Sequence, residues 1–422
     1  MPMNTERSFR RAQSGVATLA ITMLLLFAIS LVVLFANRSL IFEQRASANQ
    51  VRATKAFEAA ESGLEWATAM LNEPRGIDSQ CRPNQSSAPF RAKYVPMDDQ
   101  LALRIVPNSH PACRFRGTSL ACSCPDSGTN PDLTVGNEDG ASFAISFEAV
   151  AANPDSIRVL STGCTNVSAD CIPGADSGPA DATARSSVIL KLRPLLRVLP
   201  GAALTAGGSV SLSGSTVLRN VDRLTAGILV EAGGDVLVGD SVQLASLPGS
   251  PAINALAANE SSLGRLNRES DDGESFFNAF FAMPIGHYRA TTMVRTVSDA
   301  TAGARGQALL TAYQQGYDAF YVDGDLVFES PSIGSTSRPL LLVSSRAIAC
   351  SQACTVHGLI YSDSTLTDRD AGTGVQVRGA VIARGDHRQS TGDSVSYDPA
   401  TLSRLRQQAA IFVRVPGSWR DF

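Results

Sequence analysis

The sequence predicts an α+β protein in which a long N-terminal helix packs on an antiparallel sheet and a β-rich domain with a helical insertion follows. Three observations support this class. Residues 16–72 contain no proline and a single glycine, Gly63. Strand-like segments between glycine- and proline-rich loops then continue to about residue 197, and from residue 198 short apolar strands recur around glycine turns. With 422 residues, the chain is also longer than one typical domain.

The helix begins with an apolar run over residues 16–36 that contains no charged side chain. At 1.5 Å per residue, about 20 apolar residues cover roughly 30 Å, the thickness of the hydrocarbon core of a bilayer. Three arginines, Arg7, Arg10 and Arg11, precede the run. Their position predicts a cytoplasmic N-terminus and an exported remainder. The run is too long for the core of an ordinary secretory signal, so we expect a single-pass transmembrane helix.

The second half of the helix, over residues 37–72, is amphipathic. Glu58, Glu61 and Glu65 recur three and then four residues apart, and alanine, the best helix former, is frequent. Pro74 and Gly76 end the helix. We therefore expect one continuous helix whose first half lies in lipid and whose second half lies outside the membrane.

Residues 13–70 resemble the N-terminal region of PilX-type minor pilins, which serve type IV pilus assembly. The resemblance rests on a short basic leader ending in Gly15, on the apolar helix starting at Val16, and on residues 57–64. These eight residues, Phe57-Glu58-Ala59-Ala60-Glu61-Ser62-Gly63-Leu64, are similar to the F-x-A-A-E-A-G-L of the family. Residues 415–422 also resemble the end of large PilX-like proteins, whereas the middle of the chain is similar only loosely.

The resemblance implies that a prepilin peptidase removes the leader, residues 1–15, and that the new N-terminus on Val16 is methylated. It implies insertion in the inner membrane with the bulk of the chain in the periplasm, and later incorporation into a cell-surface pilus or fimbrium. The implied partners are other minor pilins, the major pilin, the prepilin peptidase and, before assembly, inner-membrane lipid. The residues expected in the assembly helix are Ala20, Phe57, Glu58, Glu61, Gly63 and Leu64.

Ala20 departs from the pattern of major pilins, which carry a glutamate at this fifth position of the mature helix. In those proteins the acid is thought to pair with the N-terminal amine of a neighbouring subunit. A lone carboxylate in lipid costs a few kcal/mol and is kept only where it has a partner. A subunit without this acid is best tolerated where no neighbour lies ahead of it. We therefore expect a tip or priming position.

The eight cysteines all follow the apolar run, so all would reach an oxidising compartment. Cys164 with Cys171 and Cys350 with Cys354 are candidate local disulfides. The other four cysteines allow three pairings, and the sequence does not choose among them. They are Cys81, Cys113, Cys122 and Cys124. A zinc site is the less favoured alternative, because the Cys122–Cys124 spacing lacks the usual two-residue gap and His110 is the only nearby histidine.

Residues 73–197 are expected to form the antiparallel sheet that covers the amphipathic half of the helix, as in the pilin architecture. The candidate strands are residues 101–106, 142–150, 156–161 and 182–192. The segment 117–140 is rich in serine, glycine, proline and aspartate, so we expect a loop pinned by disulfides.

Residues 198–422 are expected to form the β-rich domain. Three similar segments start at Gly207, Gly233 and Asp323, and each places a glycine turn before alternating apolar residues. Such repeats favour a solenoid-like stack, in which each turn of the chain buries its apolar side on the next. Because the spacing is irregular, a β-sandwich remains the alternative. Residues 252–317 are expected to be a helical insert, in which an aromatic cluster packs on the stack or forms a partner-binding surface. The cluster is Phe276, Phe277, Phe280 and Phe281.

No enzyme motif is present: the sequence lacks a nucleophile elbow, a phosphate-binding loop and an HExxH helix. Two groups of acids could form a carboxylate pair or a calcium site, but aspartates in turns more often cap the local backbone, so we expect that role for both groups. They are Asp323 with Asp325, and Asp363 with Asp368 and Asp370. The formal net charge is −3, and no basic stripe of the kind that nucleic-acid binding needs is present. We expect no cofactor, no metal and no nucleic acid.

Three functions therefore compete. The first is a minor pilin or pseudopilin that initiates or caps a fibre. The second is an adhesin or surface-binding module on the same stem. The third is a membrane-anchored periplasmic β-helical enzyme whose anchor is never cleaved. The sequence favours the first function, but it does not distinguish a twitching pilus from a secretion pseudopilus.

Overall fold

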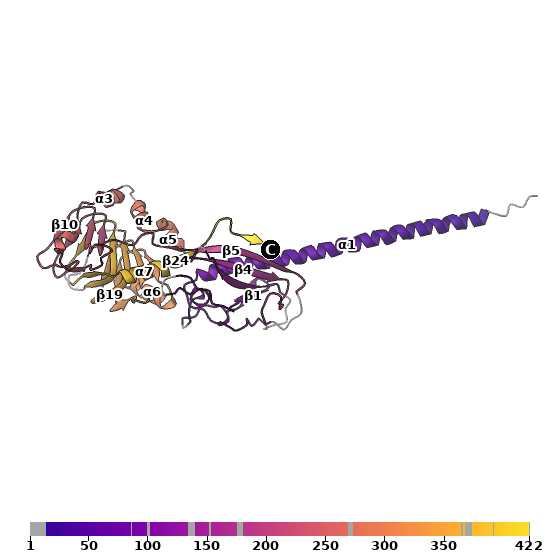
Figure 1. The fold of residues 1–422 in the computed structure, drawn as a ribbon, viewed down its shortest axis with the longest axis horizontal. Helices are drawn as coiled ribbons and strands as arrows, with labels where there is room; N and C mark the ends of the chain where they lie inside the picture. Colours follow the sequence, from indigo (N-terminus) through magenta and orange to yellow (C-terminus); the bar gives the residue numbers. More distant parts are fainter. Residues whose placement is uncertain are drawn as a thin grey trace, which may run out of the picture.

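In the computed structural model the protein is elongated, and one long helix projects from a two-part body (Figure 1). The structure describes residues 14–85, 87–98, 102–133, 140–151, 153–174, 180–268, 273–363, 366–367, 374–390 and 392–421. The helix α1 spans Ser14–Leu71 without a break. This agrees with the predicted continuous helix and with its predicted end before Pro74.

An antiparallel sheet packs on the second half of α1, and we call these elements the sheet module. Its strand order is β2-β1-β3-β4-β5-β24, with β25 also paired to β5. Leu64, Phe143, Val159 and Leu190 are among the buried residues of its core. The elements are α2 (Phe90–Tyr94), β1 (Ala112–Arg116), β2 (Ser119–Ser123), β3 (Ser142–Ala149), β4 (Ser156–Cys164), β5 (Thr183–Pro194), β24 (Ala410–Arg414) and β25 (Arg420–Asp421).

Three of the predicted strands are present as β3, β4 and β5. The segment 101–106 is not a strand, and its described part makes only an isolated bridge between Met97 and Leu103. The segment 117–140 begins inside a hairpin, because Gly117 takes a positive φ in the turn between β1 and β2. The cross-strand pair Cys113 and Cys122 lies in this hairpin.

The second part of the body is a stack of short strands, which we call the parallel stack. Every strand pair that the structure describes from β6 to β23 is parallel. Parallel pairing of successive turns is what the solenoid-like alternative requires, whereas a β-sandwich is built mainly from antiparallel neighbours. Leu204 pairs with Val230, a spacing of 26 residues, whereas Ala319 pairs with Leu341, a spacing of 22. Different corner lengths therefore explain the irregular repeat.

The strands of the stack are short because corners interrupt each turn of the chain. They are β6 (Leu204–Ala206), β7 (Val210–Leu212), β8 (Val217–Arg219), β9 (Val230–Ala232), β10 (Val236–Val238), β11 (Gln243–Ala245), β12 (Leu256–Ala257), β13 (Val294–Val297), β14 (Ala319–Val322), β15 (Leu326–Phe328), β16 (Ser332–Ile333), β17 (Leu340–Ser344), β18 (Ile348–Cys350), β19 (Cys354–Ser362), β20 (Leu366–Thr367), β21 (Val375–Ala383), β22 (His387–Gln389) and β23 (Ser394–Tyr397).

The longer strands β19 and β21 contain a glycine at a positive φ. Gly358 and Gly379 face each other in the ladder, with φ values of 142° and 145°. A Cβ on Gly379 would lie 1.8 Å from the carbonyl oxygen of Gly358, so no larger residue fits. Glycine therefore permits both the backbone conformation and the close approach at this position.

The chain enters the parallel stack in the middle and not at an end. The first turn, β6 to β8, stacks on β9 to β11 on one side and on β21 to β23 on the other. Leu204 of β6 thus pairs with both Val230 and Val381. The chain builds the stack outward to β12, moves through helices to the opposite end at β13, and returns to the middle.

The predicted insert at 252–317 contains helices but also strands of the stack. Its helical elements are η1 (Ala252–Ala255), α3 (Ser261–Arg268), α4 (Glu274–Phe280), α5 (Ile285–Ala290) and α6 (Ala302–Gln315). Both β12 and β13 fall inside the same range and pair with β9 and β14. The range is therefore part of the stack, because its helices join the two ends of the ladder.

The aromatic cluster is buried, so it packs the helices on the stack. Phe276, Phe277 and Phe281 are fully buried, and the ring centroids of Phe277 and Tyr361 lie 5.2 Å apart. These rings are not available as a partner-binding surface.

The end of the chain returns to the sheet module. After α7 (Pro399–Gln408), β24 pairs with β5 from Ala410 opposite Pro194, and β25 also pairs with β5. The range 198–422 is therefore not one unit, because the parallel stack is inserted between two neighbouring strands of the antiparallel sheet.

Candidate assembly interface

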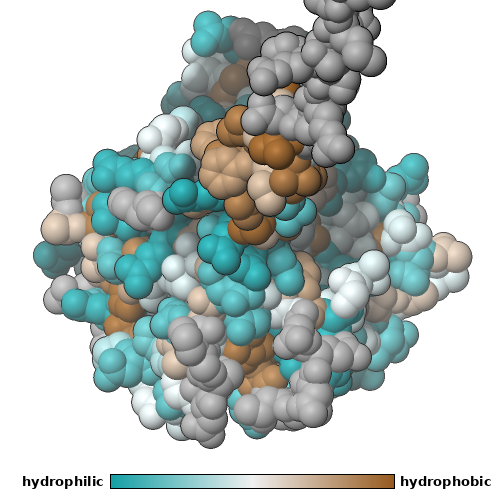
Figure 2. Space-filling model, turned by 90° about the vertical axis from the view of Figure 1, so that its right-hand side faces the viewer, coloured by the Kyte–Doolittle hydropathy of each residue, from teal (hydrophilic) through white to brown (hydrophobic). Residues whose placement is uncertain are grey.

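The first half of α1 exposes its apolar side chains. Among the described side chains of residues 16–55, every one is exposed. The fractions reach 73% for Val16, 64% for Phe27 and 79% for Phe35. Figure 2 looks along this helix from its N-terminal end, and the main hydrophobic area on the viewed face lies where the helix points toward the viewer, in front of a largely hydrophilic body. By length and composition, α1 is the one described helix that could cross a membrane. Burying this surface in lipid or against other helices would be strongly favourable.

The predicted processing site lies at the start of this helix. Ser14 is the first described residue of α1, and Gly15 and Val16 follow within its first turn. Residues 1–13 of the leader lie outside the described residues. Ala20 is exposed on the apolar half and lies one turn after Val16. The first turn after Val16 therefore contains no carboxylate.

The second half of α1 approaches the sheet unusually closely, because small residues meet there. Ala56 and Ala60 are fully buried. A Cβ added to Gly163 of β4 would lie 2.2 Å from the carbonyl oxygen of Ala56 and 2.4 Å from the amide nitrogen of Ala60. A Cβ added to Gly63 would lie 2.2 Å from Oγ of Ser161. The role of Gly63 is thus to bring the helix backbone onto the sheet.

The last residues of the chain hold the outer side of α1, and we call residues 414–421 the C-terminal clasp. The indole Nε1 of Trp419 donates a hydrogen bond to Oε1 of Glu61 at 2.9 Å. The ring of Trp419 meets that of Phe57 edge-on, with centroids 6.4 Å apart. Arg414 forms an ion pair with Glu65 at 2.8 Å. The clasp thereby fixes the direction in which α1 leaves the body.

The two sequence segments that resemble the family therefore touch each other. Sequence analysis identified Phe57, Glu61 and the segment around Trp419 separately, and it did not predict their contact. The contact joins residues that are about 358 positions apart, as for Glu61 and Trp419. Leu64 is buried in the sheet core, whereas Glu58 is exposed beside the clasp. Some of the residues predicted for the assembly helix, such as Leu64, therefore pack in the core, whereas others, such as Glu58, lie on the surface.

All eight cysteines are paired. The two local pairs are Cys164–Cys171 and Cys350–Cys354. The open choice among the other four is resolved as Cys81–Cys124 and Cys113–Cys122. Three of the four disulfides lie in the sheet module, where they pin its loops. The described part of the chain contains no cluster of three or more residues suited to bind a metal.

The acids that sequence analysis weighed for chemistry have other neighbours. Oδ1 of Asp323 accepts a hydrogen bond from the hydroxyl of Ser345 at 3.3 Å. Asp363 forms an ion pair with Arg384 at 3.0 Å. The backbone carbonyl of Asp325 accepts a hydrogen bond from Arg305. Asp368 and Asp370 lie outside the described residues. These contacts are ion pairs and hydrogen bonds within the parallel stack.

A long helix with an exposed apolar half, packed through small residues on an antiparallel sheet, is the arrangement that the resemblance to PilX-type pilins leads one to expect. Residues 14–65 match the family model described as PilX N-terminal. The resemblance to the PilX N-terminal domain is therefore confirmed for this segment.

Among solved structures, the chain is similar to the competence-associated pilin ComZ from Thermus thermophilus. The identity is 13%, the TM-score is 0.23, and the match covers 88% of this chain and 97% of that chain. No curated protein matches the chain.

Proposed function

We propose that this chain is a minor pilin-like subunit that primes or caps a type IV pilus and sits at its tip. Before assembly, the apolar half of α1 would lie in the inner membrane, with residues 1–15 in the cytoplasm and the bulk in the periplasm. A prepilin peptidase would cut after Gly15 and the amine of Val16 would be methylated. The same apolar helix would then pack against other minor pilins and the major pilin.

The main support for a tip position is where the parallel stack lies relative to α1. The stack lies beyond the C-terminal end of α1, on the side opposite the apolar half (Figure 1). Thr292, next to β13, donates a hydrogen bond to the carbonyl of Asn72 just after α1 ends. In a fibre of staggered parallel helices, the body of the next subunit occupies that space. A subunit with this bulk fits best where nothing follows it.

The missing acid at Ala20 supports the same position, because it leaves no carboxylate to pair with the amine of a subunit ahead. We infer a structural role for the chain, in which the paired acids of the stack serve packing and turns. The repeated parallel turns support a β-solenoid as the architecture of the stack.

Mass spectrometry of the mature N-terminus tests the processing. A methylated Val16 is expected. An intact Met1 would instead show that the helix is an uncleaved membrane anchor. That result would favour the alternative of a membrane-anchored periplasmic enzyme.

An adhesin is the second candidate, and the far end of the stack favours it. Leu224, Leu237 and Ile253 are 94%, 64% and 64% exposed there, so apolar side chains face solvent at the end farthest from the membrane. The two functions differ in whether the stack is needed for the fibre to form.

The insertion suggests how to remove the stack cleanly. Pro194 of β5 faces Ala410 of β24 in an antiparallel pair, and Leu195 donates a backbone hydrogen bond to Ala409 at 2.8 Å. A short glycine-asparagine turn in place of residues 197–407 would connect the two strands and keep the clasp. Piliation that survives this replacement supports the adhesin, and piliation that is lost supports priming. The matched control deletes residues 199–422, which removes β24 and should disrupt the sheet in either case.

A further inference from the structure

The parallel stack ends in an open strand edge beside a helix. β13 pairs with β14, and in the part of the chain that the structure describes no other strand pairs with β13. The helix α6 runs next to it, and the two enclose a groove of about 410 Å³. A strand edge of this kind presents backbone N–H and C=O groups that an added strand can satisfy.

The shape of the groove suits an extended chain. Ala304, Ala308 and Ala312 follow each other at intervals of one helical turn along its α6 side. Their short side chains leave depth, while Gln307 and Thr311 offer polar groups along the rim. The groove therefore combines main-chain pairing on one side with room for side chains on the other.

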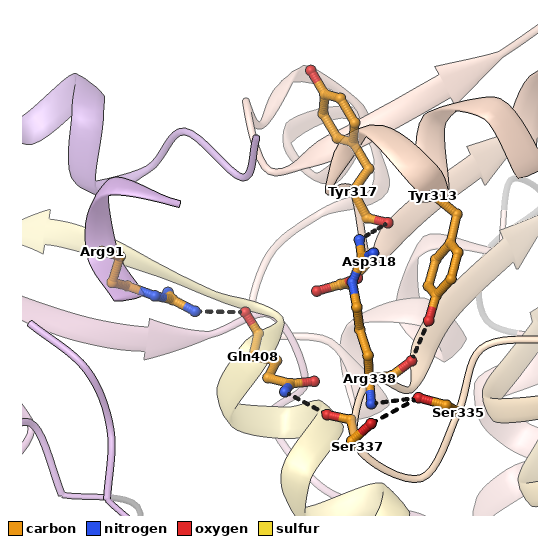
Figure 3. Close-up of polar contacts among 8 residues, drawn as sticks. All are labelled: Arg91, Tyr313, Tyr317, Asp318, Ser335, Ser337, Arg338 and Gln408. Carbon is orange, nitrogen blue, oxygen red and sulfur yellow. Dashed lines mark hydrogen bonds and ion pairs between the residues drawn. The ribbon is translucent and has the colours of Figure 1, made fainter. Parts of the chain in front are cut away.

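A second cavity continues the groove between the two modules. Its volume is about 550 Å³, it shares the wall residue Gln315 with the groove, and it has walls from the sheet module and from the stack. Its apolar wall residues include Leu71, Met97 and Met293. Figure 3 shows the polar contacts at this junction, where Arg91 of the sheet module reaches the chain of α7.

Two wall residues of this cavity carry a buried oxygen with no hydrogen-bond donor from the described residues. They are Gln407 (Oε1) and Gln408 (Oε1). The amide of Gln408 is oriented by its own donor, because Nε2 donates a hydrogen bond to the carbonyl of Ser337 at 3.0 Å. The neighbouring carboxylate of Asp318 is already paired, because Arg338 lies 2.6 Å from its Oδ1. Both unpartnered atoms are acceptors, so a ligand that donates hydrogen bonds suits them.

The charge of the cavity wall further limits the chemical class of the ligand. Its wall contains three acids and three arginines, so it has no net charge to attract a small ion. The acids are Glu73, Asp98 and Asp318, and the arginines are Arg91, Arg338 and Arg404. A neutral polypeptide main chain supplies the N–H donors, and its side chains fit the apolar wall.

We propose that the β13–α6 groove and the junction cavity together form a docking site for an extended peptide segment of a partner protein. The segment adds as a strand to the outer edge of β13 and continues between the modules, as in recognition by β-strand addition. This proposal does not depend on the pilus function, since it rests on the groove and its unpartnered acceptors.

The experiment uses the full-length chain in detergent micelles and a phage library of random linear peptides about ten residues long, which span roughly 33 Å when extended. Enriched peptides are synthesised, and their affinity is measured by fluorescence anisotropy. Hydrogen exchange then locates the site. Slower exchange of residues 294–297 is expected on binding, because the added strand would bond the amides of the β13 edge.

Two variants distinguish this groove from other surfaces. Ala304→Trp fills the groove from an exposed position of α6, so the chain should still fold, and it is expected to weaken binding about tenfold or more. The matched control is Ala258→Trp, an exposed alanine outside the groove, which should leave the affinity unchanged. A peptide whose backbone is N-methylated at alternate residues should not bind.

Three outcomes would overturn the proposal. The first is a library that yields no peptide above background, which would mean that water and not a peptide satisfies the unpartnered acceptors. The second is an enriched peptide that binds Ala304→Trp as tightly as the wild type. The third is protection of residues 294–297 by a panel of simple sugars and not by any peptide.

Discussion

The sheet module and the parallel stack are stabilised in different ways. In the sheet module, α1 approaches β4 at backbone distance through Ala56, Ala60 and Gly163, and three disulfides pin the loops. The stack relies on repeated parallel ladders over a continuous apolar interior, with one disulfide at Cys350 and Cys354. The difference indicates that the module that holds α1 tolerates little movement, whereas the stack is an addition between two adjacent strands.

The largest expected effect comes from Gly163→Ala. Its Cβ would meet backbone atoms of α1, which cannot move aside as a side chain could. We expect a loss of about 3 kcal/mol, and a fall of roughly 10 °C in the unfolding midpoint of the sheet module. Calorimetry should show the transition of the stack unchanged.

Gly286→Ala in α5 is the matched control, because its Cβ meets nothing within 4 Å. It should be neutral, or stabilising by up to about 1 kcal/mol. Equal losses for the two substitutions would show that the helix does not approach the sheet as described.

The disulfides offer the second contrast. Cys81 and Cys124 are 43 positions apart, whereas Cys350 and Cys354 are four apart. The loop-entropy estimate gives about 4 kcal/mol for the longer loop and about 2 kcal/mol for the shorter one. Paired Cys→Ser variants should therefore destabilise the sheet module more than the stack, as measured by denaturant unfolding. A larger loss for the Cys350–Cys354 pair would contradict this comparison.

The C-terminal clasp gives a smaller effect, because Trp419 is 45% exposed. Trp419→Ala removes the ring contact with Phe57 and the hydrogen bond to Glu61, and should cost about 1 kcal/mol. Hydrogen exchange at Ser186 and Ser187, which pair with β25, should rise about fivefold. Trp419→Phe keeps a ring and should lie between the two. Unchanged exchange in the alanine variant would mean that the contacts of Trp419 do not hold β25 against β5.

The junction between the two modules gives an effect that depends on pH, through Asp318. Burial raises the pKa of its carboxyl from the ordinary 3.8 to about 6, although Arg338 and Arg91 lower it in part. The folded chain then binds more protons than the unfolded chain between about pH 4 and pH 6. The contribution of Asp318 to the free energy of unfolding is therefore full below pH 4 and is lost as the pH rises through 6.

Asp318→Asn should remove this slope, as measured by denaturant unfolding across that pH range. Asp323→Asn, at a carboxylate whose side chain is 55% exposed, is the control. An unchanged slope in Asp318→Asn would show that the carboxyl titrates normally.

Local signals predicted the local parts of the fold. The continuous helix followed from the spacing of Glu58, Glu61 and Glu65, and the absence of proline. The two short-range disulfides followed from the spacing of their cysteines. The strands β3, β4 and β5 followed from alternation. The predicted packing of α1 on the sheet is also present.

The rest depends on contacts that no local pattern encodes. Nothing near Ala410 indicates that it pairs with Pro194, and nothing near Val381 indicates that it stacks on Leu204. The β1–β2 hairpin was missed because its cysteines, arginines and serines hide the alternation of a strand. Of the candidate site, sequence analysis found the helix residues Phe57 and Glu61 and the C-terminal segment, but the contact between them required the structure.

The central proposal is that this chain occupies the tip of a fibre. Sheared pili should be labelled with gold-conjugated antibodies raised against the parallel stack, and viewed by electron microscopy. A single label at one end of a fibre is the result that the proposed function predicts. Labels spread evenly along the shafts would contradict it.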